Sequence, residues 1–241
     1  MFEPKWKQTF QVYLPNVITF SSLSCGLISI ILAGQGSLTW AAACILLCVI
    51  LDTLDGYLAR RLETASQFGI QLDSLADLVN FGVAPIFLTW QLVKIQQGFI
   101  YGIVPFFMLQ ISAGAYRLAR YNLQPIKKSS TAGSLGLTIT QAGLISTLAV
   151  LSDLSYKANS LPIWTYALLS LFLSFLMASK LILQWEKPRR RTTLIYMVLG
   201  GGLLYISSFF TTVLVLYLGS LTVSIGKFLL FGFRGSPEVS T

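Results

Sequence analysis

Apolar stretches of membrane-spanning length, separated by short polar segments, make up most of the chain. An α-helix needs about 20 apolar residues to cross a hydrocarbon core, and stretches of this length recur along the whole sequence. The pattern predicts eight helices, near residues 16–34, 38–60, 68–92, 98–121, 134–152, 161–182, 193–208 and 211–231. We therefore expect an all-α, polytopic helical membrane protein.

The last two predicted helices come from one uncharged stretch, residues 192–226. As a single helix this stretch would be about 50 Å long, so we expect a turn near residues 207–212, with a tilted or re-entrant segment as the alternative. No shift in composition marks a soluble domain. The expected organisation is an interfacial N-terminal segment (1–15), one membrane-embedded domain (16–232) and a short tail (233–241).

Composition supports a membrane protein and excludes several classes of active site. Hydrophobic residues make up 54% of the chain and charged residues only 11%, whereas soluble domains are about a quarter charged. Cys25, Cys44 and Cys48 all lie in apolar runs, which suits packing rather than a disulfide framework. The chain has no histidine. A Ser-His-Asp triad, a histidine-ligated zinc and a histidine general base are therefore excluded.

The basic residues predict the orientation of the chain. With the N-terminus on the cytoplasmic side, fifteen of the seventeen lysines and arginines fall on that side, and only Lys94 and Lys157 fall outside. The positive-inside rule therefore places both termini in the cytoplasm. The cluster at 187–191 is interpreted as a topology determinant that contacts anionic membrane lipid. Nucleic-acid binding is disfavoured because the basic residues are scattered, and the short loops favour a prokaryotic inner membrane.

Four aspartates interrupt the apolar pattern at the facing ends of the second and third predicted helices. An ionisable side chain inside a membrane is costly, so it marks a functional site with a compensating partner. Asp52 and Asp55 lie within about 60° of each other on one helix, and Asp73 and Asp77 follow on the next. Because the joining loop is short, the four carboxylates are expected to converge at the cytoplasmic end. The run reads Asp52-x2-Asp55-Gly56-x2-Ala59-Arg60-x8-Gly69-x3-Asp73-x3-Asp77.

Convergent carboxylates suit two hard divalent cations, Mg²⁺ or Mn²⁺, and a site of this type suits phosphoryl transfer. One alternative is a set of ion pairs with arginines that only lock helices together, involving Arg60, Arg61, Arg117 and Arg120. A second is an ion- or proton-coupled transporter, which would string its acids across the membrane depth instead of gathering them at one end.

The acidic run resembles the signature of the CDP-alcohol phosphatidyltransferase family at every fixed position and spacing. The resemblance implies a six-helix membrane core, here with two further helices, that moves a phosphatidyl group from a CDP-linked lipid to an alcohol and releases CMP. It also implies two divalent metals and is compatible with a homodimer. By the resemblance, Asp52, Asp55 and Asp73 are metal ligands, and Asp77 is both ligand and general base. The positions expected to receive the cytidine and diphosphate are Gly56, Ala59, Arg60 and Gly69.

The segment that extends the acidic run is similar to the phosphatidylserine synthase branch of this family. Ser74 follows the third acid, and residues 81–85 read Phe-Gly-Val-Ala-Pro after the fourth. Residues 14–16, 25–26 and 117–122 point the same way. The resemblance therefore implies CDP-diacylglycerol and L-serine as substrates.

The second half of the chain departs from this branch. Residues 136–140 lack both prolines of its pattern, and the sixth predicted helix lacks the usual Arg-Tyr-Pro continuation. Glycerol 3-phosphate or an inositol phosphate therefore stay open as acceptors. Thr138 and Thr140 are expected to add hydroxyls to the acceptor pocket.

Arg117 and Arg120, at the end of the fourth predicted helix, have two interpretations. As substrate-binding residues they would hold the acceptor's carboxylate or the lipid diphosphate, because a guanidinium offers paired donors to such groups. As structural residues they would extend to the headgroup region.

Overall fold

A computed structural model describes residues 5–64, 66–97, 101–123, 134–155, 161–179 and 182–183. The helices predicted at 193–208 and 211–231, the turn at 207–212 and the basic cluster at 187–191 lie outside these residues.

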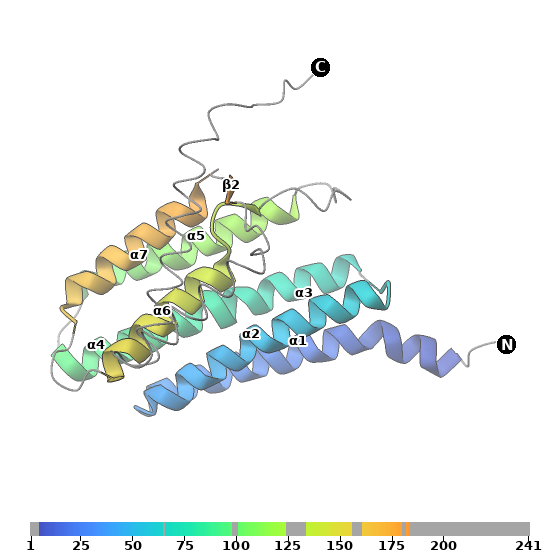
Figure 1. Cartoon of the computed structure of the whole chain (residues 1–241), viewed down its shortest axis with the longest axis horizontal. Coiled ribbons are helices and arrows are strands. Elements are labelled where there is room, and N and C mark those ends of the chain that lie inside the picture. Colours follow the sequence, from blue (N-terminus) through green and yellow to red (C-terminus); the bar gives the residue numbers. More distant parts are fainter. Residues whose placement is uncertain are drawn as a thin grey trace, which may run out of the picture.

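The described residues are almost entirely helical, as the apolar pattern predicted. The helices are α1 (Lys5–Gly34), α2 (Leu38–Arg61), α3 (Gln67–Asp77), the π-helical segment η1 (Leu78–Val83), α4 (Ala84–Gln97), the 3₁₀ turn η2 (Tyr101–Ile103), α5 (Val104–Asn122), α6 (Ile139–Ser155) and α7 (Ile163–Ala178). The strands are β1 (Ser134–Leu135) and β2 (Ile182–Leu183), which pair antiparallel. α1, α2 and α3 run side by side, α5 and α7 form the opposite layer, and α6 lies between them (Figure 1).

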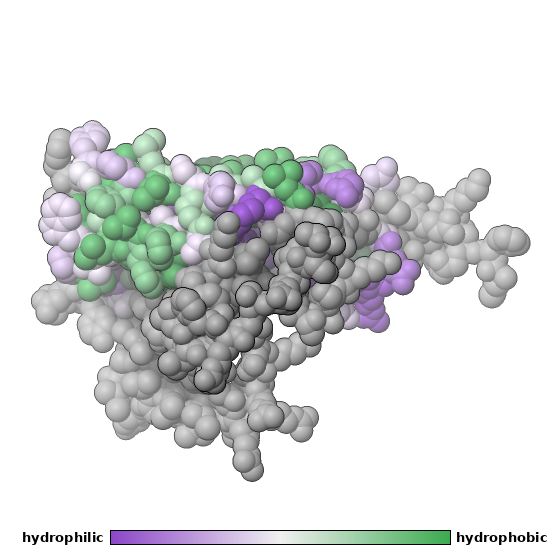
Figure 2. All heavy atoms as spheres, turned by 90° about the horizontal axis from the view of Figure 1, so that it is seen from above, coloured by the Kyte–Doolittle hydropathy of each residue, from purple (hydrophilic) through white to green (hydrophobic). Residues whose placement is uncertain are grey.

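Three helices within the described ranges are long and apolar enough to cross a membrane. They cover Tyr13–Gly34, Leu38–Arg61 and Gln67–Gln96, and α6 and α7 are shorter apolar helices. Apolar side chains cover a large part of the described face in Figure 2. Large ones point outward, including Trp40 (71% exposed) and Phe175 (69%). These features are those of an all-helical membrane protein.

Several helix ends differ from the prediction. The first helix starts at Lys5 rather than 16 and continues through Pro15, so the segment expected to be interfacial is continuous with the spanning helix. The fifth predicted helix begins at Ile139 rather than 134, because the chain first forms β1 and Gly136 has a φ of 74°, in the left-handed region. The helix predicted at 161–182 ends at Ala178, because the chain leaves α7 to form β2.

Small polar side chains fasten α1 to α2. Ser29 Oγ donates to Ala41 O at 2.8 Å, Cys25 Sγ lies 3.5 Å from Cys44 O, and Cys48 Sγ lies 3.4 Å from Ser22 O. Small residues allow helices to approach closely in an apolar medium, where such hydrogen bonds hold them together. The three cysteines are free thiols, in agreement with the packing role predicted for them.

The π-helical segment η1 is held from both sides. Buried Asn80 donates to Ser22 Oγ of α1 at 2.9 Å. On the other side, a Cβ added at Gly143 of α6 would lie 2.6 Å from Phe81 O, so only glycine permits this close packing. A π-helical turn widens the backbone by one residue and is frequent at functional sites. Here it begins directly after Asp77, so these contacts fix the place where the acidic run ends.

Candidate active site

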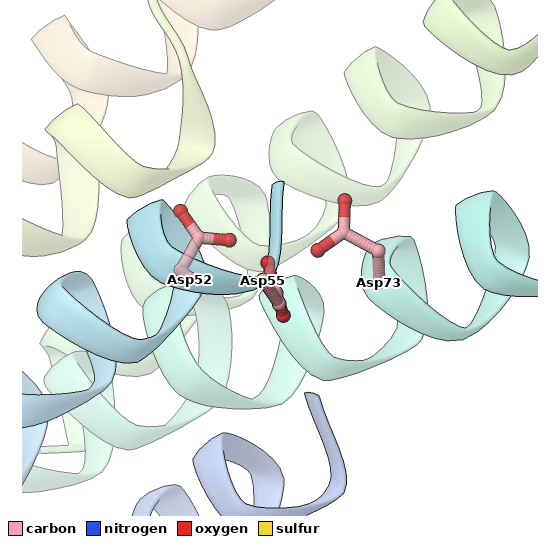
Figure 3. A group of neighbouring side chains, drawn as sticks. All are labelled: Asp52, Asp55 and Asp73. Atoms are coloured by element: carbon pink, nitrogen blue, oxygen red, sulfur yellow. The ribbon is translucent and has the colours of Figure 1, made fainter. Parts of the chain in front are cut away.

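Three of the four predicted acids meet between α2 and α3. One carboxylate oxygen from each of Asp52, Asp55 and Asp73 lies within 4.8 Å of the other two. Figure 3 shows Asp55 between the other two, with Asp52 coming from α2 and Asp73 reaching across from α3. Asp55 is buried (5% exposed), and the other two are half-buried. The convergence expected from the sequence is thus present for these three residues.

The end of α2 is set by a hydrogen-bonded C-cap of the Schellman type. The amide of Thr64 donates to Ala59 O at 3.1 Å and the amide of Glu63 lies 3.4 Å from Arg60 O. This motif places one residue in the left-handed region, usually glycine. Here that residue is Glu63, with a φ of 54°. The chain therefore turns sharply after the end of α2, and α3 begins at Gln67, only a few residues later.

The start of α3 is capped by Ser66, whose Oγ accepts a hydrogen bond from Gly69 N at 3.0 Å. A Cβ added at Gly69 would lie 3.2 Å from Asn16 Oδ1 of α1 and 3.2 Å from Ser66 Oγ. The motif glycine thus allows the first turn of α3 to lie against α1. This contact brings Asp73, one turn further on, close to Asp52 and Asp55 of α2.

Thr19 of α1 holds the central acid. Its Oγ1 donates to Asp55 Oδ2 at 2.7 Å and also lies 3.0 Å from Pro15 O. A short hydrogen bond to a buried carboxylate fixes the orientation of that carboxylate. Sequence reasoning missed Thr19. The available signal was a buried polar stripe on α1, formed by Thr19, Ser22 and Ser29, but nothing in the sequence indicated its partners.

Asp77 lies at the last position of α3, and its carboxyl group is within hydrogen-bonding reach of Asp52. It is not one of the three acids whose oxygens lie within 4.8 Å of one another. Asp77 also interacts electrostatically with the buried Arg117 of α5.

The donor set fits hard divalent cations. Three carboxylates at this spacing offer only oxygen ligands, and their mutual repulsion in a half-buried site favours a bound cation. The three acids form one compact group, whereas a transporter would space its acids across the membrane depth.

In the alternative without a metal, the four aspartates would form ion pairs with arginines. The described hydrogen bonds of two of these arginines go to other groups. Arg61 Nη1 donates to the Tyr57 hydroxyl at 3.0 Å. Arg120 donates to Ala178 O at 3.3 Å and to Ser179 O at 3.2 Å, and lies over the Tyr116 ring. Arg120 therefore helps to cap the end of α7, a role that differs from both interpretations given from the sequence, substrate binding and extension to the headgroup region.

Three of the positions expected to receive the nucleotide, Gly56, Ala59 and Arg60, follow Asp55 on α2, and the fourth, Gly69, lies in the first turn of α3. Arg60 folds back over its own helix, where a Cβ added at Gly56 would lie 3.2 Å from Arg60 Nη1. Gly56 and Ala59 are both half-buried. The missing side chain at position 56 thus leaves room for a guanidinium beside Asp55.

Arg117 and Thr138 differ in the hydrogen bonds that their side chains make within the described residues. Arg117 is buried (7% exposed), and its Nε has no hydrogen-bond partner among the described residues. Thr138 instead caps α6, since its Oγ1 accepts from Gln141 N at 3.2 Å and Gln141 Oε1 accepts from Thr138 N at 3.2 Å. Thr138 therefore caps α6 through its oxygen, and the contribution expected of Thr138 and Thr140 to an acceptor pocket stays a prediction.

Comparison with known proteins adds a family and named relatives. The family model described as CDP-alcohol phosphatidyltransferase matches residues 12–224. A CDP-diacylglycerol–serine O-phosphatidyltransferase of Helicobacter pylori is 39% identical over 142 residues, 59% of this chain and 59% of that protein.

Two further relatives carry related names. A Bacillus subtilis protein with the same name as the Helicobacter relative is 36% identical over 169 residues, 70% of this chain and 88% of that protein. An archaetidylserine synthase of Methanothermobacter thermautotrophicus is 35% identical over 119 residues, 48% of this chain and 50% of that protein. The match spans less than two thirds of the Helicobacter relative's length (59%).

Proposed function

The chain belongs to the CDP-alcohol phosphatidyltransferase family, and on this premise we propose that it transfers a phosphatidyl group from CDP-diacylglycerol to L-serine. The products are phosphatidylserine and CMP. The observation that carries the proposal is the group formed by Asp52, Asp55 and Asp73, whose oxygens lie within 4.8 Å of one another on the family's acidic run. The serine acceptor rests on the relatives' names and on the Ser74 to Pro85 segment.

Asp52, Asp55, Asp73 and Asp77 would hold two divalent ions, Mg²⁺ or Mn²⁺. Bound there, the ions would neutralise the diphosphate and the charge that develops on the transferred phosphoryl group. Thr19 keeps Asp55 in one orientation through its 2.7 Å hydrogen bond. The protein's own contribution is therefore a set of carboxylates held in place before substrate arrives.

In the reaction, the serine hydroxyl oxygen forms a bond to the phosphorus that carries diacylglycerol. The bond between that phosphorus and the oxygen of the CMP phosphate breaks, and CMP leaves with the bonding electrons. Asp77 accepts the hydroxyl proton, because its carboxyl group lies within hydrogen-bonding reach of Asp52 and no histidine is present in the chain. Gly56, Ala59, Arg60 and Gly69 receive the cytidine and diphosphate.

Arg117 binds the carboxylate of the acceptor. Its buried Nε, which has no hydrogen-bond partner within the described residues, supports this role, since buried polar groups are normally satisfied. Arg120 contributes to substrate binding only indirectly, because its described hydrogen bonds stabilise the end of α7.

For the whole protein we propose the organisation expected from the sequence. It comprises eight transmembrane helices with both termini cytoplasmic, an interfacial segment 1–15, a single domain 16–232 and a tail 233–241. The protein forms a homodimer in a prokaryotic inner membrane and carries its active site at the cytoplasmic face. The concentration of basic residues on one side of the predicted topology supports this orientation.

The test is CMP release by the purified protein with CDP-diacylglycerol and Mn²⁺ or Mg²⁺. L-serine, glycerol 3-phosphate, inositol phosphate and no acceptor are compared. We expect release that requires both serine and metal. Release driven by a phosphorylated acceptor alone would keep the transferase chemistry and overturn the serine acceptor, and metal-independent release would overturn the role of the acids.

A further inference from the structure

A seam of uncharged polar side chains joins α3 to α5 beside the acids. Asn122 Nδ2 donates to Ser74 Oγ at 3.0 Å and to Gln71 Oε1 at 3.3 Å. Ser74 Oγ lies 3.3 Å from Asn122 Oδ1 and also donates to Ile70 O of its own helix at 3.0 Å. Gln71 is exposed, and Ser74 and Asn122 are half-buried. We call these three residues the amide seam.

The amide seam continues directly into the reaction site. Ser74 follows Asp73 and precedes Asp77 by three residues, which places it about 60° from Asp77 around α3. On α5, the Arg117 guanidinium lies over the ring of Tyr121, the residue before Asn122, with 6.0 Å between its Cζ and the ring centroid, and Arg117 interacts electrostatically with Asp77. A path along α3 and α5 therefore leads from the amide seam toward Asp77 and Arg117.

A second observation indicates that a ligand belongs on this path. Arg117 is 93% buried, since only 7% of its surface is exposed, and its Nε has no hydrogen-bond partner among the described residues. Leaving such a buried donor unsatisfied is unfavourable, because it has lost its hydrogen bonds to water. A small polar molecule between α3 and α5 would satisfy Arg117 at one end and contact the amide seam at the other.

We infer that Gln71, Ser74 and Asn122 recognise the ammonium group of the acceptor amino acid. The inference rests on the proposed function, since it assigns the hydroxyl of serine to Asp77 and the carboxylate to Arg117. The amide oxygens of Gln71 and Asn122 and the hydroxyl of Ser74 are acceptors that suit an ammonium. Positions three apart on a helix lie roughly 5–6 Å from each other, a span that suits a molecule the size of serine.

The seam also has a purely structural reading, in which it only fastens α3 to α5. The two readings differ in what a substitution changes. A fastening role predicts a lower melting temperature with an unchanged KM for serine. A recognition role predicts a raised KM for serine with little change in the KM for CDP-diacylglycerol.

The experiment uses the full-length protein purified in detergent and compares Asn122→Ala, Asn122→Asp and Ser74→Ala with wild type. We expect Asn122→Ala to raise the KM for L-serine about tenfold, the loss expected for one hydrogen bond to a charged group, with the KM for CDP-diacylglycerol within about twofold of wild type. Asn122→Asp should keep or lower the serine KM, because a carboxylate attracts an ammonium.

Ser24→Ala is the matched control for Ser74→Ala. Ser24 is exposed on α1 and, like Ser74, donates to the carbonyl four residues earlier, at 2.9 Å from Phe20 O. It should behave as wild type, while Ser74→Ala should raise the serine KM. Equal effects of the two substitutions would overturn the role of Ser74.

The outcomes separate this inference from the proposed function. If wild type uses serine but Asn122→Ala leaves its KM unchanged, the seam is only a helix contact and the proposed function stands. If Asn122→Asp raises the serine KM as much as Asn122→Ala, the ammonium assignment is wrong. If wild type releases CMP only with a phosphorylated acceptor, both proposals fail.

Discussion

Replacing Thr19 by valine tests whether the first helix organises the acidic site. Valine keeps the branched shape of threonine and removes only the hydroxyl that donates to Asp55 Oδ2 at 2.7 Å. Thr19 is 5% exposed, as is Asp55, so water has little access to replace the lost donor. The substitution should therefore act on the orientation of Asp55 rather than on packing.

The expected size follows from the geometry. A hydrogen bond to a charged group contributes about 1.5–3 kcal/mol, and removing a partner that orients a metal ligand typically lowers metal affinity by about 10–100-fold. Because Thr19 Oγ1 also lies 3.0 Å from Pro15 O, its single proton is shared between two acceptors. We therefore expect the lower end of the range, about a tenfold weaker affinity for Mn²⁺.

The assay is a titration of the purified protein with Mn²⁺, following free ion by electron paramagnetic resonance, so that it does not depend on turnover. Thr53→Val is the matched control, because Thr53 is exposed on α2 and its hydroxyl donates to Val49 O of its own helix at 2.8 Å. Thr53→Val should bind Mn²⁺ as wild type does. Affinity of Thr19→Val within about twofold of wild type, or equal losses in both variants, would refute the reasoning.

Three further substitutions give separate tests. Asp77→Asn should lower kcat by at least about a hundredfold, as loss of a general base does, while the melting temperature stays near that of wild type; near-normal turnover would remove Asp77 as the base. Gly143→Ala should lower the free energy of unfolding by about 1–3 kcal/mol, because the new Cβ would lie 2.6 Å from Phe81 O. The control in thermal melts is Gly102→Ala, whose Cβ meets nothing within 4 Å. Equal melting temperatures of the two variants would contradict the close packing at Gly143. Glu63→Gly should raise the melting temperature, because glycine removes roughly 1 kcal/mol of left-handed strain at a φ of 54°; a lower melting temperature would show that the side chain of Glu63 outweighs its backbone strain.

The sequence predicted the helices and the acidic group well, because each depends on patterns that are local in the chain. The apolar runs set the positions of α1, α2 and α3, and the spacing of Asp52, Asp55 and Asp73 around a short loop predicted their convergence. The count of eight helices stays a prediction, since the last two lie outside the described residues.

What the sequence did not predict depends on how helices far apart in the chain pack together. Thr19 lies 36 residues before Asp55, and only the register of α1 against α2 makes them partners. Arg117 and Arg120 are three residues apart and indistinguishable by pattern, yet one is buried near Asp77 and the other caps α7. The π-helical segment after Asp77 gives no periodic signal, because one extra residue in a uniformly apolar run leaves the pattern unchanged.

The most direct test of the central claim is the incorporation of labelled L-serine into lipid. Purified protein is incubated with CDP-diacylglycerol, labelled serine and Mn²⁺, and the chloroform-extracted product is identified by mass spectrometry. The account predicts labelled phosphatidylserine in an amount equal to the CMP released, with neither product formed in the presence of a chelator. CMP release without label in the lipid, or labelled lipid formed equally well with chelator, would contradict it.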